Sequence, residues 1–271
     1  MQTATEGNGV DLVFMGEAFT DKDMASGGAY EKKMQAAMEQ FFSQEPYTSL
    51  RDRFNVYMVK VVSPNEEFSE DAVHAINEDD ETAFDYAVKA VGENPDNIMV
   101  GVVYNTNTSI DRSYCTMYFG DGSCVAYIMD DINQVLNHEL GGHGLAQLFD
   151  EYVEWGNESE SLPEDEKEFL EDVWQYGSGA NVDWRSDPAE VKWAKFISDP
   201  RYSAEGIGVY EGAMLYGQGA YRPTVNSMMR YNDCGFNAPS RESIYKHVMT
   251  YSEGESWTDE GGGAGPTPRG L

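Results

Sequence analysis

The sequence predicts an α/β (α+β) fold in which a mixed, twisted sheet with its helices precedes a less regular C-terminal part. Apolar runs rich in β-branched and aromatic residues alternate with helical patterns over roughly the first half of the chain, an order typical of α/β proteins. Beyond Tyr152 this alternation gives way to acidic and glycine-rich segments. A chain of 271 residues, 41% of them hydrophobic, is long enough to bury a large core.

The strands and helices are expected in a definite order. Residues 10–19, 53–62 and 97–105 are apolar and β-rich, and each range predicts a buried strand. Residues 111–130 predict a hairpin that turns at the Gly-Asp-Gly-Ser sequence of residues 120–123. Helices are expected at 21–42, at 81–91, in the segment that follows Asp130 and Asp131, and, as short helices, at 163–175, 187–198 and 239–251.

A single domain is expected to contain most of the chain. Its predicted ranges are residues 1–255 overall, 9–149 for the N-terminal α/β lobe and 150–255 for the C-terminal lobe. Residues 256–271 are rich in Gly and Pro and predict a flexible tail. Cys115 and Cys124 flank the hairpin turn, and the sequence leaves open whether they form a disulfide or stay free thiols.

The acidic composition excludes several kinds of partner. The chain has 48 Asp and Glu against 18 Lys and Arg, a formal charge of −30, so it lacks the basic footprint that nucleic acid requires. An anionic membrane surface is disfavoured for the same reason, and no apolar run is long enough for a transmembrane span. The N-terminal residues lack the pattern of a signal peptide, so either the protein is cytosolic or a leader has been removed. Neither the oligomeric state nor calcium binding follows from the sequence.

The segment HELGGHGLAQLFDEY, residues 138–152, has the composition of a zinc-binding helix but an unusual histidine spacing. A His-Glu-x-x-His helix places two imidazoles four residues apart on one face. Here His143 follows His138 by five residues, and such positions differ by about 140° around an α-helix. A π-bulge would absorb the extra residue, and Gly141 and Gly142 stand where it would form. The alternative is that both histidines are ordinary helix residues and the glycines allow close packing.

The same segment offers a general base and a third ligand. Glu139 follows the first histidine, where zinc peptidases carry the carboxylate that moves a proton from the attacking water to the leaving amine. On a straight helix Asp150 would lie about 10 Å along the axis from His143, so the chain must turn back before residue 150. Metzincin-type zincins turn at a glycine and then supply a ligand, at positions that correspond here to Ala146 and Phe149. Asp150 therefore lies one residue beyond the position at which metzincins carry their third ligand.

A second motif, NSMMRYN at residues 226–232, has the Ser-x-Met-x-Tyr form of the Met-turn beneath the zinc of metzincins. Met229 would form an apolar floor under the metal. Tyr231 would direct its hydroxyl toward the site, where it could donate to the oxyanion of the reaction. Core filling is the alternative for the methionine pair, but the occurrence of both motifs in this order favours a metal site.

With its doubled glycine and closing Asp-Glu-Tyr, the chain resembles the immunoglobulin-A peptidase family of gut bacteria, which are metzincin-like zinc endopeptidases. The segments DLVFMGEAFT and YRPTVNSMMRYN are similar to that family's flanking segments, so the resemblance covers about residues 9–252. It implies a zincin fold, an exported protein, one zinc ion on His138, His143 and Asp150, and Glu139 as general base. Glu151, or a glutamate within 163–172, is the alternative third ligand. Two positions depart from the family's pattern: the sequence GEAF at 16–19 and Ala146.

The function expected from these observations is that of a secreted zinc metallopeptidase. Its partner would be a protein or peptide, bound as an extended strand along the edge of the 111–130 hairpin. Two alternatives remain from the sequence alone. One is a binding module that keeps the fold without zinc or turnover, and the other is a zinc amidase acting on cell-wall peptides. His74 and His247 lie outside any ligand spacing.

Overall fold

A five-stranded sheet forms the centre of the N-terminal half. The computed structural model describes residues 1–66, 73–92, 97–106 and 109–254. The strand order is β2-β1-β3-β5-β4; the first four strands are parallel, and β4 pairs antiparallel with β5 at the edge. The strands are β1 (Val10–Glu17), β2 (Phe54–Val59), β3 (Met99–Tyr104), β4 (Tyr114–Met117) and β5 (Cys124–Ile128). The predicted strands and the predicted hairpin are therefore confirmed.

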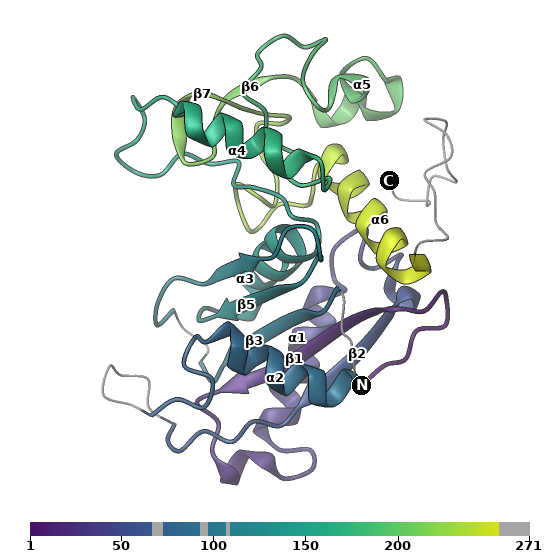
Figure 1. The fold of residues 1–271 in the computed structure, drawn as a ribbon, viewed down its shortest axis with the longest axis vertical. Helices are drawn as coiled ribbons and strands as arrows, with labels where there is room; N and C mark the ends of the chain where they lie inside the picture. The colour runs from purple at the N-terminus through teal and green to yellow at the C-terminus, as the bar shows by residue number, and fades with distance from the viewer. Residues whose placement is uncertain (67–72, 93–96, 107–108, 255–271) are drawn as a thin grey trace.

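Both faces of this sheet are covered by helices, which explains why its strands are continuous apolar runs. Along β1, Leu12 and Phe14 face one apolar cluster, and Val13 and Met15 face the other. Helix α1 (Ala29–Phe41) packs on the first face, and α2 (Asp80–Val91) packs on the second. Figure 1 shows the two helices on opposite sides of the strands.

The prediction of a helix over residues 21–42 is wrong for its first third. Only a 3₁₀ turn, η1 (Asp21–Met24), forms there, and α1 begins five residues later at Ala29. Gly27 lies between them with φ 68°, a left-handed conformation that ends any continuous helix. Another 3₁₀ turn, η2 (Arg51–Arg53), precedes β2.

The segment GEAF at residues 16–19 has a structural role. The Glu17 side chain is completely buried at the end of β1. Its carboxylate accepts hydrogen bonds from the Ser63 hydroxyl and from the backbone N–H groups of Ala75 and Ile76. Glu17 therefore fastens the long β2–α2 connection to the sheet.

The segment that carries the two histidines is helical. Helix α3 (Ile132–Leu136) begins after Asp131, whose carboxylate caps it by accepting from the Asn133 N–H at 3.1 Å. It continues directly into η3 (Asn137–Leu145), which is a π-helix. The expected local bulge is thus a π-helix of nine residues.

The C-terminal part is more regular than expected. Its elements are α4 (Glu164–Trp174), α5 (Ala194–Ile197), the 3₁₀ turn η4 (Pro200–Glu205), the antiparallel pair β6 (Tyr210–Ala213) and β7 (Tyr216–Arg222), and α6 (Ala238–Glu253). The expectation of a helix over 187–198 is wrong before Ala194, where the chain forms turns. The β6–β7 hairpin was not predicted, because Met214 and Leu215 turn it with φ 54° and 70° in place of the usual Asn or Gly.

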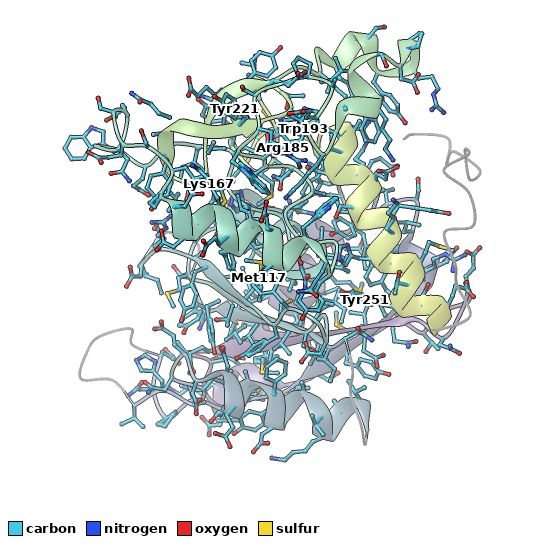
Figure 2. The ribbon with its side chains drawn as sticks, turned by 45° about the horizontal axis from the view of Figure 1, so that its top comes forward. Met117, Lys167, Arg185, Trp193, Tyr221 and Tyr251 are labelled. Carbon is cyan, nitrogen blue, oxygen red and sulfur yellow. The ribbon has the colours of Figure 1, made fainter. Side chains whose placement is uncertain are left out.

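Helix α6 joins the C-terminal part to the sheet. Its Ile244 and Val248 belong to the same apolar cluster as Leu12 and Phe14. Figure 1 shows α6 running from the region of β6, β7 and α5 down toward the sheet. Figure 2 shows Arg185, Trp193 and Tyr221 grouped in that C-terminal region, away from Tyr251 near the other end of α6. In the described ranges no helix is both long and apolar enough to cross a membrane. The tail expected at 256–271 lies outside the described residues.

The three cysteines, Cys115, Cys124 and Cys234, are free. The free-thiol alternative therefore holds in the structure. Cys124 is buried beside the histidine segment: a Cβ on Gly144 would lie 2.6 Å from its sulfur.

Candidate metal centre

The π-helix brings the two histidines together. Their Nε2 atoms lie 3.1 Å apart, and their ring centroids are 4.8 Å apart. A π-helix closes i→i+5 hydrogen bonds, so it aligns residues five apart where an α-helix aligns residues four apart. The Ala146 N–H donates to Gly141 O at 3.3 Å in this pattern. The five-residue spacing of the two histidines, one residue too long for an α-helix, thus fits the π-helix in which they lie.

Asp150 completes a group of three. Its Oδ1 lies 3.1 Å from Nε2 of His138 and 3.2 Å from Nε2 of His143. Among the described residues these three form the only group of three or more His, Cys, Asp or Glu side chains arranged to hold a metal ion.

The tautomers of both histidines are set by backbone carbonyls. Nδ1 of His138 lies 2.9 Å from Met228 O, and Nδ1 of His143 lies 2.8 Å from Leu148 O. A carbonyl can only accept, so in the neutral rings Nδ1 carries the proton and Nε2 presents a lone pair. Two lone pairs and a carboxylate oxygen then face one another at about hydrogen-bond distance. Such a group requires a cation or a proton between its members.

The triangle of donor atoms fits a zinc ion. Ligands at about 2.0–2.1 Å in tetrahedral geometry are separated by roughly 3.3 Å. The three separations here are 3.1, 3.1 and 3.2 Å. The N₂O donor set is one that zinc accepts, and hydrogen bonds at the outer ring nitrogens are usual for metal-binding histidines. Without a cation, burial lowers the pKa of His143, but the Asp150 carboxylate outweighs burial and raises it to about 9.

The chain reaches Asp150 by a turn at Gln147. This residue has φ 49°, a conformation more often supplied by glycine or asparagine. Its side-chain oxygen accepts from the Ser178 hydroxyl, and its backbone carbonyl accepts from the Gly179 N–H at 2.8 Å. Ala146, which departs from the family's pattern, keeps an ordinary helical φ of −89°. The turn expected at position 146 therefore occurs one residue later, and Asp150 follows it three residues on.

Glu151 points away from the histidines. It is completely buried, and its carboxylate accepts from Asn181 at 2.9 Å, from Ser227 at 2.7 Å and from Asn237 at 2.9 Å. Burial raises the pKa of this carboxyl, and the three hydrogen bonds oppose that rise. Neither Glu151 nor a described glutamate of α4 belongs to the histidine group.

The two glycines are required by close contacts. A Cβ on Gly142 would lie 2.2 Å from the Met229 sulfur, and one on Gly141 would lie 3.0 Å from the Tyr47 ring. Met229 is fully buried beneath the π-helix, and the neighbouring Met228 carbonyl holds His138. The glycines therefore serve both close packing and the π-helical path.

The group opens onto a cleft of about 420 Å³. The side chains of His138, His143 and Asp150 are 8, 12 and 18% exposed, so a fourth ligand could reach them from solvent. Glu139 and Tyr231 line the cleft beside His138. Tyr231 is 47% exposed, so its hydroxyl is free to turn.

Burial also changes the acidity of Glu139, which is 9% exposed. Desolvation raises its pKa, the two histidines lower it, and Asp150 raises it again, so that the pKa ends above its ordinary value. A raised pKa suits a carboxylate that must both take up and release a proton near neutral pH.

Several contributors to the site carry no signal in the sequence. Gln147 is not a residue type expected at a left-handed turn, and the Met228 and Leu148 carbonyls act through the backbone. Tyr47 is distant in sequence, yet its hydroxyl donates to Gly141 O at 2.6 Å.

Comparison with known protein families identifies the family of this chain. The profile of the family described as IgA peptidase M64 matches residues 1–201. This range includes the sheet, the π-helix and Asp150, and it ends before the Met228–Met229 turn. No curated protein matches the chain.

Proposed function

The chain belongs to the IgA peptidase M64 family and is a metallopeptidase, a hydrolase; on this premise we propose that it is a zinc-dependent endopeptidase acting on protein substrates. The observation that carries the proposal is the triangle of His138, His143 and Asp150 donor atoms, of which His138 lines a cleft that also contains Glu139. The family resemblance further supports a zincin fold of the metzincin type and a protein that acts outside the cell.

In this proposal His138, His143 and Asp150 hold the zinc ion, and Met229 lies beneath it as the floor of a Met-turn. Bound zinc would supply Lewis acidity, which polarises the scissile carbonyl and increases the acidity of water. The backbone carbonyls of Met228 and Leu148 keep both Nε2 lone pairs turned inward.

Glu139 is the proposed general base. Its carboxylate accepts a proton from the attacking water and later delivers that proton to the leaving amine. Its raised pKa supports the second half of this task. Tyr231 is proposed to donate its phenolic hydrogen to the negative oxygen that develops on the scissile carbonyl.

The substrate is proposed to bind as an extended strand along β4. This strand lies at the edge of the sheet, with β5 on one side only. Its outward N–H and C=O groups can pair with a peptide backbone. An inactive binding module is not favoured, because the chain belongs to a peptidase family and Glu139 lies in the cleft. No feature of the cleft favours a cell-wall amidase.

Metal analysis and hydrolysis of casein test the proposal together. The wild type should bind one zinc ion per chain and digest casein at neutral pH. Glu139→Gln should keep the zinc and lose about 10²-fold or more in rate, because only the proton acceptor is removed. His143→Ala should lose both zinc and activity.

Glu168→Gln, on the exposed face of α4, is the matched control and should behave as the wild type. A wild type without stoichiometric zinc, or a Glu139→Gln variant of undiminished rate, would overturn the proposed mechanism.

A further inference from the structure

Two arginines line the cleft beside the metal centre. Arg112 lies just before β4, and Arg230 directly follows Met229, so they reach the cleft from different parts of the chain. The same cleft contains His138 and Glu139. In a chain of charge −30 with only 18 Lys and Arg, two guanidinium groups at one small cleft are a local exception.

Each guanidinium is positioned by a neighbour. Arg112 donates from Nη2 to the Tyr152 hydroxyl at 2.6 Å. Arg230 donates to Val225 O, and its guanidinium carbon lies 5.0 Å from the centre of the Tyr231 ring. A guanidinium has five N–H donors in a planar fork that matches a carboxylate. The described contacts occupy only some of these donors.

The carboxylates around Arg112 leave room for another anion. Glu154 and Asp150 are the carboxylates that act on its guanidinium, and Asp150 is held by the two histidines. Asp130, which lines the same cleft, accepts from the Ser113 hydroxyl at 2.9 Å. Glu154 lies 3.4 Å from Arg112, in a pair whose side chains are 65% and 43% exposed. Exposed pairs of this kind are weak, so a substrate carboxylate with better geometry can replace Glu154.

The position of Arg112 indicates which part of a substrate it meets. β4 runs from Tyr114 to Met117, so Arg112 lies at its N-terminal end. A peptide paired antiparallel with the free edge of β4 runs the opposite way, and its C-terminal residues approach Arg112. Arg112 therefore faces substrate residues that follow the scissile bond, and Arg230 lines the same cleft.

We propose that Arg112 and Arg230 select a carboxylate on the C-terminal side of the scissile bond, supplied either by an Asp or Glu side chain or by the terminal carboxylate of a peptide. The inference rests on the proposed peptidase function and names its substrate class. It is tested with a series of fluorescent peptides of one sequence, capped at both ends. The first or second residue after the bond is Glu, Gln or Lys.

The wild type should cleave the Glu peptides with a kcat/KM about tenfold or more above the matched Gln peptides, with Lys poorest, because only the Glu side chain forms charge-assisted hydrogen bonds. A Gln peptide with a free C-terminus at the same distance identifies the other source of the carboxylate. If it alone is favoured, the arginines bind chain ends; if only the Glu side chain is favoured, they bind internal residues.

Variants assign the preference to these residues. Arg112→Gln and Arg230→Gln should each reduce the Glu-to-Gln ratio, and the double variant should bring it close to one. Arg230→Glu should favour Lys peptides. The matched control Arg201→Gln removes an exposed arginine of η4 that pairs with Asp199, the residue before that turn, and should keep the wild-type ratio.

A wild type that digests casein but cleaves Glu, Gln and free-acid peptides equally well overturns this inference and leaves the peptidase proposal standing. A double variant with an unchanged ratio overturns it as well. A zinc-loaded wild type that hydrolyses neither peptides nor casein overturns both proposals.

Discussion

At position 142 even a methyl group would collide with the sulfur of Met229, which would lie 2.2 Å away. The contact is internal to the metal centre, because the next histidine along the chain is His143 and the neighbouring carbonyl of Met228 holds His138. Gly142 is therefore fixed by packing between the π-helix and a turn more than 80 residues later.

Gly142→Ala should destabilise the protein by about 1–3 kcal/mol, a cost typical of overpacking in a core, despite the better helix propensity of alanine. The displaced Met229 turn should also weaken metal binding. Urea unfolding of the metal-free protein and a competitive zinc titration measure the two effects.

Gly235→Ala is the matched control, since the nearest atom to its added Cβ is 3.9 Å away. Equal stability of the two variants would show that the contact at Met229 relaxes without cost.

Glu17 predicts an acid-sensitive component of stability. Burial raises the pKa of its carboxyl, but hydrogen bonds from Ala75, Ser63, Ile76 and Ala18 outweigh burial and hold the pKa below its ordinary value of 4.5. A group with a lowered folded pKa contributes its stability above the unfolded pKa and loses it as the pH falls through the folded pKa. The free energy that Glu17 contributes to folding should be complete above about pH 4.5. It should be lost progressively as the pH falls below that value.

Glu17→Gln should cost about 1–3 kcal/mol at pH 6, because an amide cannot accept at both positions. This difference from the wild type should shrink as the pH falls toward 3. Urea unfolding between pH 3 and 6, with chelator present to exclude metal effects, gives the two curves. A difference that stays constant over this range would contradict the prediction.

At the scale of single residues, the sequence predicts the chemistry better than the geometry. His138, His143, Glu139 and Asp150 are all recognisable from their types and order. The structure groups the two histidines with Asp150, and His138 lines one cleft with Glu139. The sequence could not separate Asp150 from its neighbour Glu151, because the choice depends on the turn at Gln147. The conformation of Gln147 depends on hydrogen bonds from Ser178 and Gly179, which are distant in the chain.

The π-helix η3 is an element held in shape from outside. A nine-residue π-helix has poor intrinsic stability, since such helices occur mostly as single turns. Here Tyr47 donates to the Gly141 carbonyl within it, and Met229 and Cys124 fill the space beside its glycines. Metal ligation at positions 138 and 143 would add a further constraint.

Tyr47→Phe should therefore destabilise the fold by about 1 kcal/mol and loosen the π-helix, because a buried carbonyl loses one of its donors. Thermal unfolding measures the first effect, and amide hydrogen exchange over residues 137–145 measures the second. Tyr245→Phe is the matched control, because the Tyr245 hydroxyl makes no hydrogen bond among the described residues. Unchanged exchange in Tyr47→Phe would mean that the remaining contacts suffice.

Elements differ in how far the sequence predicts them. The strands of the main sheet were identified because parallel strands buried on both faces are continuous apolar runs. The β6–β7 hairpin was missed because both strands contain glycine and its turn residues are Met214 and Leu215. Helix α5 begins only at Ala194, and the preceding residue, Trp193, donates from its side chain to Gly208 O at 2.7 Å.

The whole molecule combines a strongly acidic composition with a candidate metal centre built from distant segments. The proposed ligands come from η3 and the turn after it, and the proposed floor comes from residues 228–229. The Glu151 N–H donates to Met229 O at 2.8 Å, which ties the third-ligand turn to that floor. The centre is therefore sensitive to the relative position of these segments.

The charge of −30 predicts that the protein becomes more stable as salt is added, because self-repulsion in the folded state is screened. The urea midpoint should rise between about 20 and 300 mM NaCl, where the Debye length falls below about 10 Å. Tetramethylammonium chloride should give the same rise, which would separate screening from binding of a particular cation. A midpoint that falls with salt would contradict the prediction.

The short edge strand would limit what the proposed peptidase can reach. β4 has four residues, and only alternate ones direct their backbone groups outward. A polypeptide bound along it in the proposed way would gain few ladder bonds and would have to be extended when it arrives. Helices and paired strands would have to unravel first. We therefore expect cuts in interdomain linkers and loose chain ends, with the folded modules on either side released intact.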